Sequence, residues 1–412
     1  PLRRRSRSCS LPPVLTGRKT SHCLTGRQIT EPGNLRESAS ERAVRCETLD
    51  VANVIWIVGG WLVGWWLFGK PRKLAVPSPE IDGYTVSVII PARNEAQSLP
   101  LLLGDLERVR PEGTEVIVVD DSSTDDTLEL ARSFDGVSVF PAGETPTGWL
   151  GKPWACHVGA MAAGNDTLVF LDSDVRLEPG AIEAMVRELG VRGGLVSVGP
   201  YHATERPYEQ ASAIFGVVAA MGIAVGDPAR TDGAFGPALA THRADYELVG
   251  GHESVRSDSV EAMALARNDR DADRAVTVLL GGPELRFRMY PGGFASLVEG
   301  WTKNFATGAG NTALFRLLAI VVWLTAMGSA FSTLLGSFGG FGPLVLSVAM
   351  CGAYAFQLRS MFARLGNFST LTAVLFPLQL AVFFAVFFRS LWFTLVRRRV
   401  RWRDREIALG AV

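Results

Sequence analysis

The chain lacks an excess of charge of either sign, since 41 Lys and Arg residues balance 41 Asp and Glu residues. A protein that binds nucleic acid usually carries a basic surplus, so we expect no nucleic-acid partner. Cysteine and histidine are also scarce, with five of each in 412 residues. The cysteines form no CxxC pair and the histidines are scattered, so neither a zinc site nor a disulfide framework is indicated. Unpaired thiols of a reducing compartment are expected instead.

Charge is missing altogether from three long stretches. Residues 51–69, 317–358 and 365–388 contain no Asp, Glu, Lys or Arg and are rich in Leu, Val, Phe and Trp. At about 1.5 Å per residue, the first can cross the roughly 30 Å core of a bilayer. Buried helices of a soluble protein are the alternative, but such long uncharged runs are rare there. We therefore expect a transmembrane anchor over 50–70 and two or three transmembrane helices over 313–396.

The membrane orientation is harder to predict. Residues 1–49 lack apolar periodicity and are predicted to be a disordered arm. The basic residues just after the anchor place the following domain in the cytosol, and we expect a multi-pass protein of the plasma membrane. The arginine-rich tail after residue 388 would then lie outside the cell. Either 365–388 dips in without crossing, or 208–226 crosses instead of forming the interfacial helix that we favour, or the number of spans is wrong by one.

Residues 84–200 alternate strand and helix patterns, which predicts an α/β domain with a mostly parallel sheet. The domain is expected to extend over 84–300. Its expected strands are 85–90, 115–119, 137–140, 167–171 and 194–198, and its expected helices are 97–109, 124–133, 153–163 and 179–189.

Polar residues follow the carboxyl ends of three of these strands, in VSVIIPARNE (86–95), VIVVDDSS (116–123) and VFLDSDV (169–175). Ligands of open α/β sheets bind beyond these ends. Two bare carboxylates, Asp172 and Asp174, would repel a diphosphate, whereas a divalent cation between them reverses the sign of the interaction. The pattern predicts a nucleotide-sugar site that uses Mg²⁺ or Mn²⁺.

Together with GWLGKPWA (148–155) and GGHE (250–253), these motifs resemble the inverting glycosyltransferases of family two, which have a GT-A fold. The finer matches are PYHATERPYEQ (200–210), FGPALATHRADYELVGGHE (235–253) and EGWTKNFATGA (299–309). They are similar to the membrane-bound branch that glycosylates carotenoid acids or hopanoid-type lipids, the diaponeurosporenoate glycosyltransferases among them. The resemblance covers about residues 51–400. It implies that one sugar moves, with inversion, from a nucleotide donor such as a UDP-sugar to a lipid acceptor.

The resemblance also implies roles for individual residues. It assigns donor binding to Pro91, Ala92, Arg93, Glu95, Asp120, Lys152 and Asp172, with Asp174 as the metal ligand. Among these, Asp120 would contact uracil and ribose, and Lys152 the phosphates. The alternatives are helix capping by the acidic and serine residues after Asp120 and an ordinary solvated Lys152. Trp149 and Trp154 could serve as sugar platforms or as packing residues.

The expected general base is missing. Inverting transfer to a hydroxyl needs a base, which in the family is the Asp of a Glu-Asp pair after the GGHE segment. Here Glu261 matches the Glu, but Ala262 stands in place of the Asp. On a helix, Asp258 and Glu261 would share a face, so either could act as the catalytic base. An acceptor that is already an ionised acid would need no strong base, and an impaired enzyme is the third possibility.

Trp301 and Lys303 precede the membrane region, where an acceptor's polar end would emerge from lipid. We expect them on the acceptor side of the site, although Trp301 could instead be an interfacial anchor. The Gln-x-x-Arg-Trp element of processive relatives is absent, which favours a single sugar transfer. Another lipid or polysaccharide glycosyltransferase, or a nucleotide-sugar-binding membrane protein with impaired catalysis, remains the alternative.

Overall fold

The computed structural model describes residues 50–76, 84–226, 231, 233–308, 312–338, 340–397, 399–402 and 405–408. The predicted disordered arm, 1–49, lies outside these residues.

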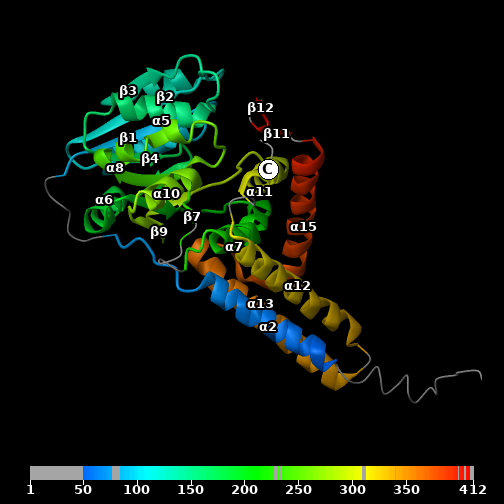
Figure 1. Cartoon of the computed structure of the whole chain (residues 1–412). Coiled ribbons are helices and arrows are strands. Elements are labelled where there is room, and N and C mark those ends of the chain that lie inside the picture. The colour runs from blue at the N-terminus through cyan, green and yellow to red at the C-terminus, as the bar shows by residue number, and fades with distance from the viewer. Residues whose placement is uncertain are drawn as a thin grey trace, which may run out of the picture. The chain divides into compact units, whose positions relative to one another are not determined.

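A seven-stranded sheet forms the centre of the α/β domain, with strand order β3-β2-β1-β4-β8-β6-β9 (Figure 1). Its strands are β1 (Val86–Ala92), β2 (Thr114–Asp120), β3 (Val137–Pro141), β4 (Thr167–Leu171), β6 (Leu195–Gly199), β8 (Ala238–His242) and β9 (Val276–Leu280). Neighbouring strands pair in parallel except at β8, which is antiparallel to both β4 and β6. The mostly parallel sheet predicted from the sequence is confirmed.

Helices cover both faces of this sheet, which explains why its strands are almost continuously apolar. They are α3 (Leu99–Val109), α4 (Thr127–Arg132), α5 (Gly151–Ala162), α6 (Ala181–Arg192), α8 (Arg243–Leu248), α9 (Gly251–Ser254) and α10 (Glu261–Asp271). Along β1, Val88 and Ile90 pack in one apolar layer with Leu102 of α3, while Ile89 packs in the other with Ala155 of α5. This alternation fixes the register of β1 between the two layers.

A second, three-stranded sheet was not predicted. It consists of β5 (Val175–Leu177), β10 (Leu285–Phe287) and β7 (Tyr201–His202), in the order β5-β10-β7. Arg176 of β5 donates to both carboxylate oxygens of Asp105 in α3, at 2.5 and 2.9 Å. Burial would raise the pKa of Asp105, but these hydrogen bonds hold it below its usual value. The pair fixes the segment that follows the Asp172-Ser173-Asp174 turn against the main domain.

Within the described residues, four helices are long and apolar enough to cross a membrane, judged by length and composition. They are α2 (Val51–Phe68), α12 (Leu314–Gly336), α13 (Phe341–Leu365) and α15 (Phe376–Trp392), whose apolar stretch continues to Val396. Such helices mark a membrane protein.

Helices α2, α12 and α13 form a bundle (Figure 1). Tyr354 donates to the carbonyl of Ile57 at 2.9 Å, and Gln357 donates to that of Trp61 at 2.7 Å. A Cβ at Gly60 would lie 2.2 Å from that of Ala326, so only glycine permits this close approach. Small residues and interhelical hydrogen bonds are the usual means by which such helices associate.

The predicted interfacial helix over 208–226 is shorter than expected and buried. A 3₁₀ turn, η1 (Pro207–Ser212), leads into α7 (Ala213–Gly222), which contacts α2, α12, α13 and α15. Ten residues rise only about 15 Å, so α7 is too short to cross a bilayer. Its largest side chain, Phe215, is fully buried in the protein.

Both ends of α15 lie against segments that belong to the α/β domain or lead out of it. At its start, α14 (Thr370–Val374) is attached to η1, because Ser369 N and Thr372 Oγ1 donate to Gln210 Oε1 at 2.9 and 2.6 Å. At its end, Ser390 donates to the carbonyl of Thr302 in α11 (Phe294–Gly308) at 2.9 Å. In Figure 1, α15 diverges from the bundle of α2, α12 and α13. The chain continues through η4 (Phe393–Arg397) into the hairpin of β11 (Arg399–Trp402) and β12 (Arg405–Ala408).

Candidate active site

A cavity of about 2610 Å³ lies beyond the carboxyl ends of β1, β2 and β4. Most of the predicted site residues line it: Pro91, Ala92, Arg93, Glu95, Lys152, Asp172, Asp174, Asp258, Glu261, Trp301 and Lys303. The structure therefore gathers residues from five separate segments of the sequence around one space. Their individual roles stay predictions.

The loops after β1 and β2 are joined to each other and form one end of the cavity. Arg93 Nη1 donates to the carbonyl of Asp121 at 2.7 Å, and Asn94 Oδ1 accepts from the backbone of Thr124 at 2.8 Å. Asn94 adopts a positive φ of 53°, a conformation that Asn tolerates better than most residues. These bonds give the base and ribose end of the predicted donor site a fixed shape.

Asp120 is the one predicted donor residue that does not line the cavity. It ends β2, is 6% exposed, and accepts a hydrogen bond from Ser123 N at 3.2 Å. Its Oδ1 accepts no hydrogen bond from the described part of the chain. The next residue, Asp121, does line the cavity. Local capping is provided instead by Asp125, whose carboxylate accepts hydrogen bonds from both N and Oγ1 of Thr127.

Asp172 and Asp174 lie in a tight turn between β4 and β5. Asp172 N donates to the carbonyl of Pro237 at 2.8 Å, and Val175 N donates back to the carbonyl of Asp172 at 3.1 Å. Both aspartates and the intervening Ser173 line the cavity. The paired carboxylates thus face the space where the sequence predicted a diphosphate.

Lys152, near the start of α5, joins two carboxylates across the cavity. Its Nζ lies 2.7 Å from Asp172 Oδ1 and 2.8 Å from Glu261 Oε1. Burial would lower the pKa of Lys152, but the two carboxylates hold it well above its usual value. Burial raises the pKa of Asp172, whereas Lys152 outweighs burial at Glu261 and holds its pKa below the usual value. Glu261 is therefore a weak proton acceptor at neutral pH.

The place of the family's usual base holds a methyl group. Helix α10 begins at Glu261, so Ala262 is its second residue and is 3% exposed. A Cβ at Gly236 would lie 3.6 Å from Glu261 Oε1 and 3.7 Å from Ala262 Cβ, which places Ala262 beside the ion-paired cluster. The prediction that Asp258 shares a helix face with Glu261 is wrong, because Asp258 precedes α10. It lines the same cavity from the preceding turn.

The aromatic residues have mixed roles. Trp301 donates to Ser212 Oγ at 3.0 Å, stacks on Phe215 at 5.0 Å and is 5% exposed, so the structure contradicts an interfacial anchor. Trp149 lines the cavity, whereas Trp154 packs on His157 and donates to the carbonyl of Ala142.

Four arginines that were not predicted as site residues also line the cavity: Arg176, Arg286, Arg288 and Arg389. The first three belong to the second sheet or directly follow it. The strands of that sheet have only two or three residues, which is too short to show a periodic pattern. The alternation Arg286-Phe287-Arg288 was the available signal, because it puts both cations on one side of an extended chain.

Residues 87–224 match the family described as Glycosyl transferase family 2. The 4,4'-diaponeurosporenoate glycosyltransferase of Staphylococcus aureus (strain USA300) is 35% identical over 354 residues, which cover 83% of this chain and 93% of the relative. The chain belongs to glycosyltransferase family 2.

Two solved structures of glycosyltransferases are also similar. The mannosyltransferase PcManGT from Pyrobaculum calidifontis, in complex with GDP-Man and Mn²⁺, is 18% identical, with a TM-score of 0.49 over 83% of this chain and 97% of that one. The glucosyl-3-phosphoglycerate synthase from Mycobacterium tuberculosis, in complex with phosphoglyceric acid, is 21% identical, with a TM-score of 0.42 over 59% of this chain and 88% of that one. This family 2 member is a membrane glycosyltransferase, and its mostly parallel sheet agrees with the GT-A fold expected of the family.

Proposed function

We propose that this protein transfers one sugar, with inversion, from a UDP-sugar to the carboxylate of a long apolar acid such as a carotenoid acid. The product is a glycosyl ester. The proposal includes the division into an anchor (50–70), a transferase domain (84–300) and a C-terminal membrane region (313–396). The name of the relative, a diaponeurosporenoate glycosyltransferase, supports an acid acceptor.

The proposal depends on one observation: the position of the family's usual base holds a residue that cannot accept a proton. Ala262 cannot accept a proton, and the pKa of its neighbour Glu261 is lowered because Lys152 lies 2.8 Å away. A carboxylic acid has a pKa of about 4 to 5 and is ionised at neutral pH. It attacks the anomeric carbon without losing a proton in the transition state, so no general base is needed.

The positively charged residues of the cavity also suit a charged acceptor. Lys152 partly neutralises Asp172 and Glu261, which lowers the repulsion that these carboxylates would exert on an incoming anion. As the acceptor oxygen forms its bond to the anomeric carbon, the bond to the diphosphate breaks and the negative charge passes to the nucleotide. Arg176 and Arg286 line the same cavity.

We propose Asp174 as the direct ligand of Mg²⁺ or Mn²⁺, with Asp172 beside it, nearer the sugar. The described residues contain no cluster of three or more His, Cys, Asp or Glu that would hold a metal by itself. A site with one direct carboxylate still fits such an ion, because Mg²⁺ in nucleotide sites is usually bound by one or two carboxylates plus substrate phosphates. When bound, the ion supplies charge stabilisation to the departing diphosphate.

The proposed location is the plasma membrane, with the transferase domain in the cytosol, where nucleotide sugars are made. In this arrangement α2, α12 and α13 cross the bilayer. Helix α15 does not cross, because α14 just before it contacts Gln210 and Ser390 near its own end contacts Thr302. The arginine-rich tail then stays on the same side as the basic residues after the anchor, as the distribution of positive charge requires.

The test uses purified protein, a UDP-sugar and two acceptors that share one apolar chain but end in either a carboxylic acid or an alcohol. We expect alkali-labile glycosyl ester from the acid and little glycoside from the alcohol. Asp174→Asn is the negative control. Preference for the alcohol would refute the proposal, and so would an absence of turnover with either acceptor across several UDP-sugars.

A further inference from the structure

The cavity has a second, apolar branch beyond the residues of the proposed reaction. Three helices contribute one face each, with Gly216 and Ala219 from α7, Leu317 and Leu324 from α12, and Phe383 and Phe387 from α15. Each pair is three, four or seven residues apart, a spacing that puts both side chains on one side of a helix. None of the six carries charge, whereas the donor end of the same cavity is lined by ionisable groups.

We infer that this branch binds the apolar chain of the acceptor, so that the acceptor lies inside the protein with its reactive end beside Lys152. The inference rests on the proposed function. Sites for small molecules usually occupy about 300 to 1,000 Å³. The cavity, at about 2610 Å³, exceeds what a nucleotide sugar needs, and its remaining part is continuous with the reaction centre. A separate partner would not need that continuity.

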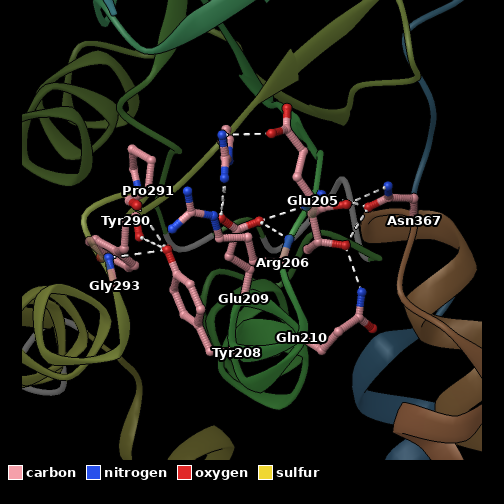
Figure 2. A network of polar contacts seen from close by, with 11 residues as sticks. Glu205, Arg206, Tyr208, Glu209, Gln210, Tyr290, Pro291, Gly293 and Asn367 are labelled. Carbon is pink, nitrogen blue, oxygen red and sulfur yellow. Dashed lines mark hydrogen bonds and ion pairs between the residues drawn. The ribbon is translucent and has the colours of Figure 1, made fainter. Parts of the chain in front are cut away.

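A polar network fixes the walls of the branch relative to the donor site. Figure 2 shows Tyr208 in η1 directed at the loop before α11, where its hydroxyl contacts the carbonyls of Tyr290 and Pro291 at 3.0 and 2.9 Å and accepts from Gly293 N at 3.1 Å. On the other side, Asn367 after α13 donates to the carbonyl of Thr204 at 3.0 Å. The network thus joins the segment before α7 to the segments that border α11 and α13.

An ion-paired contact also joins the cavity wall to the segment before α7. Arg288 lines the cavity and donates to Glu209 Oε1 through Nε and Nη2, at 3.0 and 2.8 Å. Its Nη1 lies 2.6 Å from Glu205. Because both acidic residues belong to the segment that leads into α7, this contact holds α7 against the domain.

The small residues on α7 leave room for the chain. Gly216 and Ala219 are half-buried, while Phe215, Val217 and Ala220 next to them are fully buried. A Cβ at Gly216 would meet only Leu365 Cδ1 within 4 Å, at 3.9 Å. A larger side chain at Gly216 therefore fits the helix and fills the branch rather than disrupting the packing.

The experiment compares Gly216→Leu with Gly328→Leu. Gly328 lies on α12 away from the cavity, and a Cβ there meets no atom within 4 Å. Transfer is measured to a long polyene acid and to a short water-soluble acid. We expect Gly216→Leu to lower kcat/KM about tenfold for the long acid, the loss expected when about two methylene groups are no longer buried. For the short acid, and for Gly328→Leu with either acid, kcat/KM should stay within about twofold. Equal losses for both acids, or no loss for the long acid, would overturn the inference.

A binding measurement makes the inference independent of turnover and of the folding of the variants. A long-chain acid with a diazirine in its chain is photolysed with the native protein, and the labelled peptides are identified. Labelling of α7, α12 and α15 that excess polyene acid suppresses supports the branch, even if no sugar is transferred and the proposed function fails. Labelling confined to exposed surface positions such as Phe356 and Leu371 would refute it.

Discussion

At the scale of single residues, the exchange of one carboxylate for a methyl group defines this site. The base was expected at position 262, and the sequence already showed Ala262 there. What the sequence did not show is that Lys152 holds Glu261 and Asp172 together, because the three residues are 20 to 109 positions apart in the chain. Most of the site residues predicted by motif matching do line the cavity. It could not predict how those residues pair with one another.

Replacing Glu261 by Gln tests whether this residue accepts a proton. With an acid acceptor we expect kcat to fall by less than about tenfold, because the change removes one partner of Lys152 but no base. Removal of a true base costs about 10²- to 10⁴-fold. Steady-state rates of the variant with saturating donor decide between these ranges, and a loss in the larger range would identify Glu261 as a base.

Restoring the carboxylate at position 262 should change which acceptor is used. Ala262→Asp adds a third negative charge next to Glu261 and Asp172, which Lys152 alone cannot balance. We expect lower transfer to the acid acceptor and a gain of transfer to the matching alcohol. Ala262→Asn, which has the same shape without charge, is the control. A variant with more activity on the acid would show that the native site does lack a needed base.

At the scale of elements, the buried strands were predicted to within a few residues because parallel strands covered on both faces give continuous apolar runs. The second sheet was missed, because β7 has only two residues and β5 and β10 have three each. Such short strands are determined by tertiary pairing and not by local sequence pattern. Helix α7 was partly predicted. Its apolar character was visible, but not its burial among α2, α12, α13 and α15.

The buried His252 predicts how the stability of the α8–α9 region depends on pH. Burial lowers the pKa of His252 from 6.5 to about 3, and Tyr246 OH lies 3.0 Å from its Nδ1. The unfolded chain therefore takes up a proton below about pH 6.5, whereas the folded chain does so only near pH 3. The stability that this difference contributes is present above pH 6.5 and is lost as pH falls toward 3, by up to about 1.4 kcal/mol per pH unit.

Thermal unfolding in detergent between pH 7.5 and 5 measures this effect. We expect Tm of the native protein to fall on acidification, and the difference between native protein and His252→Asn to shrink. His242→Asn, at a partly exposed position in β8, controls for the loss of a histidine. A difference between native protein and His252→Asn that does not change with pH would contradict the assignment.

At the scale of the whole molecule, counting apolar stretches gave the membrane region but not its topology. By length and composition α15 could cross the bilayer as α2, α12 and α13 do. Only the contacts just before it and near its end indicate that it does not. The alternative that 365–388 dips in without crossing is the one that these contacts favour. No sequence pattern would have shown this, since both ends are held by residues more than 80 positions away.

Cysteine labelling in cells checks this topology, in a background in which the five native cysteines are replaced by serine. Phe338→Cys, in the turn between α12 and α13, should react with a membrane-impermeant maleimide in intact cells. Ser369→Cys before α15 and Glu406→Cys after it should react only after permeabilisation. If Glu406→Cys is labelled in intact cells while Ser369→Cys is not, α15 crosses the bilayer.

The methyl group of Ala262 also affects which membrane lipids can react in the site. A membrane presents many lipids whose head groups end in hydroxyls, and each of them can diffuse to the mouth of the cavity. On the function proposed above, such lipids fail as nucleophiles because nothing in the site removes their proton. Acidity, and not only shape, then separates the true acceptor from its far more numerous neighbours.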